Sequence, residues 1–472
     1  MTAAVGGPGL EEWLLKRIYR ALVLASTAVV ALCAAAPASA EVKTETFRQK
    51  VTVSGYQVKQ EMTPAEHPKV DGFITAMSVD IVDEDGTPVP IDRLMLHHIV
   101  FSKLGDKNPQ CENFRGFNYD QQLPGLARPF YGAGEERNKL VLPPGYGLPT
   151  RQSDVWLNTW MLMNHKRTTD TAYIEWKVTT DDNPDLKRVD PYWLDVVNCN
   201  ADPIFNVPGG GKPGSTYTKS YDFTPPESGH IVGAGGHVHG GAKNLELSQP
   251  ACGNRKIMTF DPAWGMASHP FYHVRPILHE PGPIHVSQYG SPEGFPVAAG
   301  QPLRLTASYD NQLPHTRVMG ISVIYIAPSS EPVNGCGELP LNAGPFQTQE
   351  PHRTAPPKFK VPIVGIDPNS GQARDISKPP GKTVKLKTGS KINVRDFFFS
   401  RPNVVVRRGS KLNWLFRSKQ DVHNVTLASG PRGFGSPNRA KGKFSYRFKA
   451  KGKYRIFCAL HPVAMTEVVT VK

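Results

Sequence analysis

The residues best suited to chemistry are concentrated near the C-terminus of the chain. His423 lies upstream of a short segment that contains Cys458, His461 and Met465. Two imidazoles and a thiolate in one plane, with a weak axial thioether, are the ligand set of a blue-copper site. Cys458 can end a strand, and the turn after it can return His461 and Met465 to the same ion. These four residues therefore predict a type 1 copper site, and the alternative is a buried cysteine with unrelated histidines and methionine.

The segments around these residues predict short strands separated by glycine and basic turn residues. They are residues 397–399, 403–406, 411–416 and 443–448. With the ligand pattern added, residues 385–472 resemble the cupredoxins, the plastocyanin and amicyanin-like proteins. The resemblance implies a β-sandwich that holds type 1 copper through those four ligands. The sequence departs from the family at Thr466 and Glu467, which follow Met465 where a glycine is often found.

A second group of metal-type donors lies in the middle of the chain. His237 and His239 are separated by one residue, so on a strand both point to one face and can chelate one ion. Met319, on a later predicted strand, adds a soft donor, and two imidazoles with a thioether suit copper(I) better than zinc. The adjacent His97 and His98 would face opposite sides of a strand, so both can bind one ion only at a bulge or a strand end.

In their order along the chain, these motifs resemble the copper type II, ascorbate-dependent monooxygenases, the family of peptidylglycine hydroxylating and dopamine beta-monooxygenase. The resemblance covers about residues 45–330 and implies two eight-stranded β-sandwiches with one copper each. The adjacent histidines would hold an electron-relaying copper together with a third histidine. The catalytic, oxygen-activating copper would be held by His237, His239 and Met319. Structural or zinc-binding roles for these histidines are the alternative.

Two residues are candidates for the third ligand of the copper site expected at His97 and His98. Strand register places Met163 and His165 on one face of a later strand, and we prefer His165. Five more histidines in the second half of this region have no assigned role and are expected at the surface or behind the ligands: His269, His273, His279, His285 and His315.

Length and composition predict an exported all-β protein of several domains. The chain has 472 residues, 43 glycines and 44 prolines, and it lacks long helical patterns after its N-terminus. Basic residues, an apolar run and a small-residue site in the first 40 residues predict a secretory signal, or an uncleaved anchor as the alternative. We expect two jelly-roll-like β-sandwiches, a linker and a cupredoxin β-sandwich. The predicted parts are 1–40 signal peptide, 41–207 first sandwich, 215–330 second sandwich, 331–384 linker rich in Pro, Gly and Lys, and 385–472 cupredoxin domain.

Four cysteines lie outside both the signal and the predicted copper site. An even number of cysteines in an exported protein predicts two disulfide bonds, and four cysteines allow three pairings. We prefer Cys111–Cys199 and Cys252–Cys336, because each bond would then close within one predicted domain.

Charge is unevenly distributed. Residues 381–472 carry 21 Lys/Arg and 3 Asp/Glu, a net charge of +18, while the whole chain carries +14. A basic domain speeds encounter with acidic partners, so we expect an acidic redox partner or an anionic envelope polymer, and no nucleic acid. The alternative is that the charge serves only solubility.

Together these features predict a copper-binding oxidoreductase that is secreted, periplasmic or held in the cell envelope. Its substrate is a small molecule of unknown identity. The alternatives are a non-catalytic electron-transfer protein and, third, a protein that captures copper.

Overall fold

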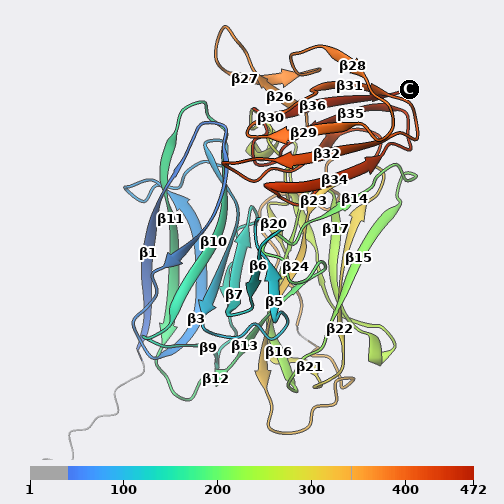
Figure 1. Ribbon diagram of the computed structural model, residues 1–472. Helices are drawn as coiled ribbons and strands as arrows, with labels where there is room; N and C mark the ends of the chain where they lie inside the picture. Colours follow the sequence, from blue (N-terminus) through green and yellow to red (C-terminus); the bar gives the residue numbers. More distant parts are fainter. Residues whose placement is uncertain (1–40, 342) are drawn as a thin grey trace, which may run out of the picture. The chain divides into compact units, whose positions relative to one another are not determined.

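A computed structural model describes residues 41–341 and 343–472 of the chain (Figure 1). The predicted signal peptide lies outside the described residues. Regular structure in the described part consists of strands and two short 3-10 helices, η1 (Pro250–Cys252) and η2 (Pro270–Tyr272). The all-β prediction is therefore confirmed. Among the described residues, the structure contains no helix that is both long and apolar enough to cross a membrane.

The first β-sandwich has a six-stranded and a four-stranded sheet. The larger sheet contains β1 (Val42–Val53), β11 (Asp170–Asp181), β3 (Gly72–Val82), β9 (Tyr146–Thr150) and β12 (Lys187–Arg188), with β8 (Leu140–Val141) also paired to β3. The smaller sheet runs in the order β2 (Val58–Ala65), β10 (Val155–Asn164), β4 (Leu94–Leu104) and β7 (Ala127–Gly134). A hairpin of β5 (Asn113–Arg115) and β6 (Gln122–Pro124) lies in the connection between β4 and β7.

The second β-sandwich has two antiparallel four-stranded sheets. One contains β13 (Asp190–Asp195), β24 (Gly320–Pro328), β16 (Gly229–Val238) and β21 (Gln288–Val297). The other contains β15 (Thr216–Phe223), β22 (Leu303–Asp310), β17 (Ala242–Gln249) and β18 (Arg255–Phe260). Small additional sheets are formed by β14 (Phe205–Val207) with β23 (His315–Val318), and by β20 (His285–Val286), β19 (Pro262–Gly265) and β25 (His352–Arg353). Alternate residues of β22 are buried, as expected for a strand with one face on a core.

The third β-sandwich, drawn in orange and red in Figure 1, combines parallel and antiparallel pairs. Its larger sheet contains β28 (Thr383–Lys385), β31 (Asn403–Val406), β36 (Thr466–Val471), β35 (Gly452–Phe457) and β33 (Thr426–Ser429). Its smaller sheet contains β30 (Phe398–Phe399), β29 (Lys391–Arg395), β32 (Lys411–Arg417) and β34 (Lys441–Arg447). The sandwich expected from the cupredoxin resemblance is therefore present.

One hydrophobic core continues from the third sandwich into the first two. The buried residues around Cys458 and Met465 form a single cluster with Met161 and Met163 of β10 and with Phe271 of η2. Residues Val42–Lys472 accordingly form one compact unit.

The segment predicted as a linker contains short strands of its own. Besides β25, it holds the hairpin β26 (Ile363–Ile366) and β27 (Ala373–Ile376). Ile363 is buried against Phe457, and Gln372 accepts a hydrogen bond from the Tyr56 hydroxyl. Strand β13 lies before the predicted boundary at residue 207 but pairs with β24 of the second sandwich. The domain boundaries themselves stay predictions.

Two disulfide bonds join the four predicted cysteines. They are Cys111–Cys199 and Cys252–Cys336, the pairing that the sequence analysis favours. Cys458 is a free and buried cysteine, so its thiol is left for other chemistry.

A buried carboxyl group beside the first disulfide should make stability depend on pH. Asp195 is 3% exposed, and burial raises the pKa of its carboxyl to about 6 although the backbone N–H groups of Val197 and Asn198 donate to it. The folded state thus keeps a proton that the unfolded chain loses near pH 4. The free energy of unfolding should fall by up to about 3 kcal/mol as the pH rises from about 4 to 6.

Asp195→Asn should remove this component. Urea unfolding of both proteins at pH 4 and pH 7 measures it, because the other carboxyl groups contribute equally to each protein. The same pH dependence in wild type and variant would contradict the prediction.

Candidate metal centres

Cys458, His461 and Met465 lie on one tight loop between β35 and β36. Strand β35 ends at Phe457, and Cys458 is the next residue. The backbone N–H of Cys458 donates to the Met465 carbonyl at 3.0 Å, and that of Met465 donates to the His461 carbonyl at 3.0 Å. His423 comes from a separate segment, where its backbone bonds to Arg439 in an isolated bridge. Backbone hydrogen bonds therefore hold the two segments that carry the four predicted ligands.

Three donor atoms of this group converge on one point. The Nδ1 atoms of His423 and His461 are 3.1 Å apart, and the Cys458 Sγ atom lies 3.9 Å and 3.7 Å from them. A point equidistant from the three atoms lies about 2.1 Å from each, close to the roughly 2.0–2.3 Å of metal–nitrogen and metal–sulfur bonds. Met465 is fully buried in the same cluster as Cys458. The residues present therefore fit a copper ion.

Carboxylates face the other ring nitrogen of both histidines. His461 Nε2 lies 3.0 Å from Asp421 Oδ2, and His423 Nε2 lies 3.5 Å from Asp396 Oδ1. A carboxylate behind a histidine fixes the tautomer that leaves the opposite nitrogen free to bind metal. Burial alone would raise the pKa of Cys458, but its contacts with the two histidines lower it to about 6. The thiolate, which is the form that binds metal, is therefore favoured at neutral pH.

His97 and His98 lie at a β-bulge in β4. Met161 of β10 is opposite His98 and Leu162 is opposite Leu96, so His97 is the additional residue of the bulge. A bulge is the condition under which adjacent strand residues can turn toward one ion. The Nδ1 atoms of the two histidines are 3.0 Å apart.

His237 and His239 form a similar pair at the end of β16. Their Nε2 atoms are 3.0 Å apart. The Tyr309 hydroxyl accepts a hydrogen bond from the His239 backbone N–H and donates one to the Met319 carbonyl. Tyr309 therefore holds Met319 next to the pair. Met319 itself lies between β23 and β24 and not within a strand, after Arg317 with its positive φ of 55°.

The two histidine pairs meet in one buried cluster between the first and second sandwiches. The rings of His97 and His239 are 4.8 Å apart, and those of His97 and His279 are 5.0 Å apart. Burial lowers the pKa of His97, His98 and His239, that of His98 to about 3. These imidazoles are therefore neutral, as metal ligands must be.

Two adjacent glutamates that follow β7 support this cluster. Glu136 is buried and lies 3.1 Å from His237 Nδ1. Burial would lower the pKa of His237, but Glu136 raises it above its usual value. A Cβ atom at Gly134 would lie 2.4 Å from His237 Cε1, so only glycine allows this approach. Glu135 bonds to His279 and faces His97.

Glu135, Glu136 and His279 are not among the site residues predicted from the sequence. The carboxylates reach the histidines across a contact between two sandwiches, and no spacing along the chain marks such a contact.

His165 and Met163, the two candidates for the third ligand of the site of His97 and His98, lie in different surroundings. His165 follows the end of β10, where its Nδ1 lies 2.9 Å from the Pro276 carbonyl. Met161 and Met163 line a small cavity together with His97 and His98. Met161, directly opposite His98 in the sheet, is a soft donor that the sequence analysis did not consider.

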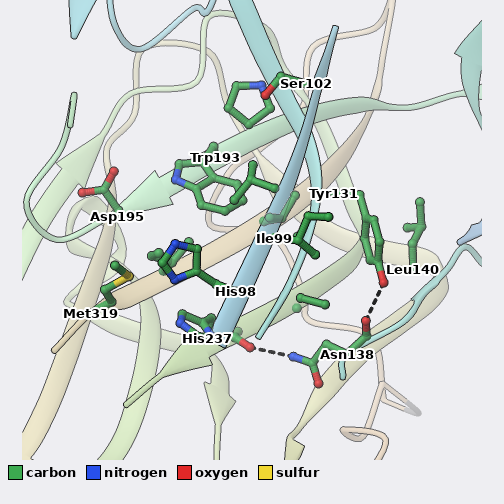
Figure 2. A pocket seen from close by; sticks show the side chains of 18 of the residues that line it. His98, Ile99, Ser102, Tyr131, Asn138, Leu140, Trp193, Asp195, His237 and Met319 are labelled. Atoms are coloured by element: carbon green, nitrogen blue, oxygen red, sulfur yellow. Dashed lines mark hydrogen bonds between the residues drawn. The ribbon is translucent and has the colours of Figure 1, made fainter. Parts of the chain in front are cut away.

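A larger cavity of about 470 Å³ lies between the first and second sandwiches (Figure 2). His98, His237 and Met319 lie together on one side of it, and Tyr131 and Leu140 lie on the other. The remaining wall is mostly apolar and includes Trp193, Tyr289 and Phe346. A small apolar molecule could therefore lie beside the histidine pairs.

Comparisons with known proteins match only a small share of the chain. No protein-family model matches it, and neither does any curated protein. A solved structure of a purple cupredoxin from Nitrosopumilus maritimus is 23% identical, covering 18% of this chain and 99% of its own, with a TM-score of 0.16. An oxidized amicyanin mutant is 22% identical and covers 17% of this chain and 80% of its own, with a TM-score of 0.16. Another amicyanin mutant, in its Cu(I) form, is 22% identical and covers 18% and 85%, with a TM-score of 0.17.

Proposed function

We propose that this protein binds copper and transfers electrons, with a type 1 copper held in its third sandwich by His423, Cys458, His461 and Met465. The observation that carries the proposal is the common point about 2.1 Å from three donor atoms of the right chemical types. Copper bound there would take up and release one electron at a time. Both the signal-like N-terminus and the disulfide bonds support a place outside the cytoplasm.

The surrounding residues would keep this site rigid. The Asn424 backbone N–H donates to the Cys458 Sγ at 3.4 Å, and the Asn424 side chain accepts from the Ala459 N–H at 2.8 Å. Asp421 holds the His461 ring from behind, and Asp396 lies 3.5 Å from the His423 ring. A site whose ligands are already in position needs little rearrangement when its charge changes, which favours fast electron transfer.

Copper content, visible absorption and electron spin resonance of the copper-loaded protein test the proposal. We expect an intense blue band, from charge transfer between thiolate and copper, and up to two further coppers without that colour. Copper-loaded protein with no blue band would contradict the type 1 assignment.

Met465→Leu tests the axial ligand. The variant should keep copper and its colour, because the three ligands in the plane are unchanged. Its reduction potential should rise, since the axial ligand tunes the potential and leucine gives the oxidised ion no donor. Redox titration of the blue band measures this, and an unchanged potential and spectrum would mean that another group occupies the axial position.

A second candidate function is the oxidation of a small apolar substrate in the larger cavity. It is supported by the position of His98, His237 and Met319 on one side of that cavity. In this function the histidine pairs would hold copper as in the monooxygenases that the sequence resembles. The apolar wall would bind the substrate and exclude water. One copper per chain with the blue signal only would contradict this candidate and leave electron transfer standing.

The polypeptide offers a short connection between the Cys458 centre and the histidine cluster. Thr426 is paired with Phe457, the residue before Cys458, and the next carbonyl, that of Leu427, accepts a hydrogen bond from the Thr316 hydroxyl at 2.8 Å. Phe457 and Ala459 line the small cavity that also contains His97 and His239. These contacts support electron transfer between the third sandwich and the histidine cluster within one chain.

The positive charge of the third sandwich supports an acidic redox partner or an anionic envelope polymer. Salt should slow the encounter with such a partner, because it screens exposed charges over about 8–10 Å.

A further inference from the structure

We propose that His97, Glu135 and His279 form a further metal site, suited to a divalent cation such as zinc. The site is distinct from the Cys458 centre and shares His97 with one of the two facing histidine pairs. One nitrogen or oxygen atom from each of the three residues lies within 4.8 Å of the others.

Glu135 presents one of its carboxylate oxygens to both imidazoles of the proposed site. Its Oε2 atom accepts the Gly282 backbone N–H at 2.8 Å. Its Oε1 atom lies 2.5 Å from His279 Nε2 and 3.8 Å from His97 Nε2. The carboxylate is thus anchored through one oxygen while the other faces both imidazoles.

His97 can serve this site without leaving its pair. It faces His98 through Nδ1, and it faces Glu135 through Nε2. The two ring nitrogens point to different places, so the ring could contact an ion on each side once it had lost its remaining N–H proton and become an imidazolate.

Both sandwiches supply ligands, and all three side chains are shielded from solvent. His97 lies in β4, and Glu135 directly follows β7, both in the first sandwich, whereas His279 lies between η2 and β20 of the second. The exposed fractions of the side chains are 9%, 6% and 16%. An ion bound here would therefore tie the first sandwich to the second.

The donor set points to a borderline divalent cation. Two imidazoles and one carboxylate with an open fourth position are a known zinc ligand set. A soft ion such as copper(I) would prefer the thiolate and thioether donors elsewhere in the chain. His97 and His279 also line the small cavity of about 60 Å³, which has room for a water molecule in the fourth position.

The competing explanation is that Glu135 only orients the two histidines by hydrogen bonding. In that case its loss should weaken ion binding nearby by about 10–100-fold without changing the number of ions bound at saturation. A ligand role predicts instead that one ion is lost.

Cobalt(II) is the probe, because its visible spectrum reports the donors around it. Metal-free full-length protein is saturated with cobalt, and bound metal is counted in wild type, Glu135→Gln, His279→Gln and the double variant. Each single variant should bind one cobalt fewer than wild type, and the double variant should lose no more than either single variant. His273→Gln is the matched control, since this exposed histidine belongs to the same connection and its ring bonds to the Ala267 carbonyl, away from the proposed ligands.

The thiolate-to-cobalt absorption of Cys458 is an internal check on folding and is independent of the proposed site. If it is retained while one ion is lost, the proposal holds even if the type 1 assignment fails. Equal saturation counts in wild type, Glu135→Gln and His279→Gln would overturn the proposal.

Discussion

Cys458→Ser is expected to abolish the intense visible absorption of the copper-loaded protein and to weaken copper binding about a hundredfold. A hydroxyl oxygen cannot supply the charge transfer of a soft thiolate. If a four-ligand site contributes about 10–16 kcal/mol, the loss of one strong donor should cost roughly 3 kcal/mol. Cys458 is the only free cysteine in the described residues, so no other described thiol can replace it.

Titration with copper, followed by absorption and by competition with a chelator, measures both effects. Met465→Leu is the control, because it changes the same loop but leaves the thiolate in place. A blue band that survived in Cys458→Ser would show that the colour arises elsewhere.

His237→Ala is expected to leave the blue band intact while slowing the reoxidation of reduced protein by oxygen by at least about tenfold. His237 touches none of the ligands around Cys458, so the colour should not change. Its loss leaves His239 and Met319, which are too few donors to hold an ion firmly. The copper expected to react with oxygen would then be lost, although His97 and His98 would remain at the sandwich junction.

Stopped-flow absorption of the reduced protein mixed with oxygen measures this rate. The control is His230→Ala, which removes a histidine near the other end of the same strand, β16. Equal rates in wild type and His237→Ala would mean that no electrons pass from the third sandwich to the histidine cluster. The blue copper would then serve an external partner.

The Cys458 centre could be predicted from sequence because three of its four ligands lie on one loop. Their spacing alone brings them together once the loop closes between two strands. From the sequence, a bulge at His97 could be named only as a requirement for His97 and His98 to bind one ion. Whether the bulge forms depends on the register between β4 and β10. The alternation of apolar and polar residues shows on which face of the sheet a side chain lies, but it does not show where the pairing register shifts.

Contacts between sandwiches could not be predicted in the same way. The meeting of His97 with His239, and the approach of Glu136 to His237, depend on how two separate sandwiches pack. Hydrophobic periodicity shows which face of a strand is buried, but not which surface covers it. For the same reason Met161 was not considered, although the structure places it opposite His98.

The continuous core between the third sandwich and β10 has a kinetic consequence. A carrier on a flexible tether finds its target at a rate set by the local concentration that the tether allows. Here Met161 and Met163 are packed into the same apolar cluster as Cys458, so the third sandwich stays docked. Exchange of electrons inside the chain should therefore be a first-order process. Its rate constant should not change with protein dilution or with the viscosity of the solvent.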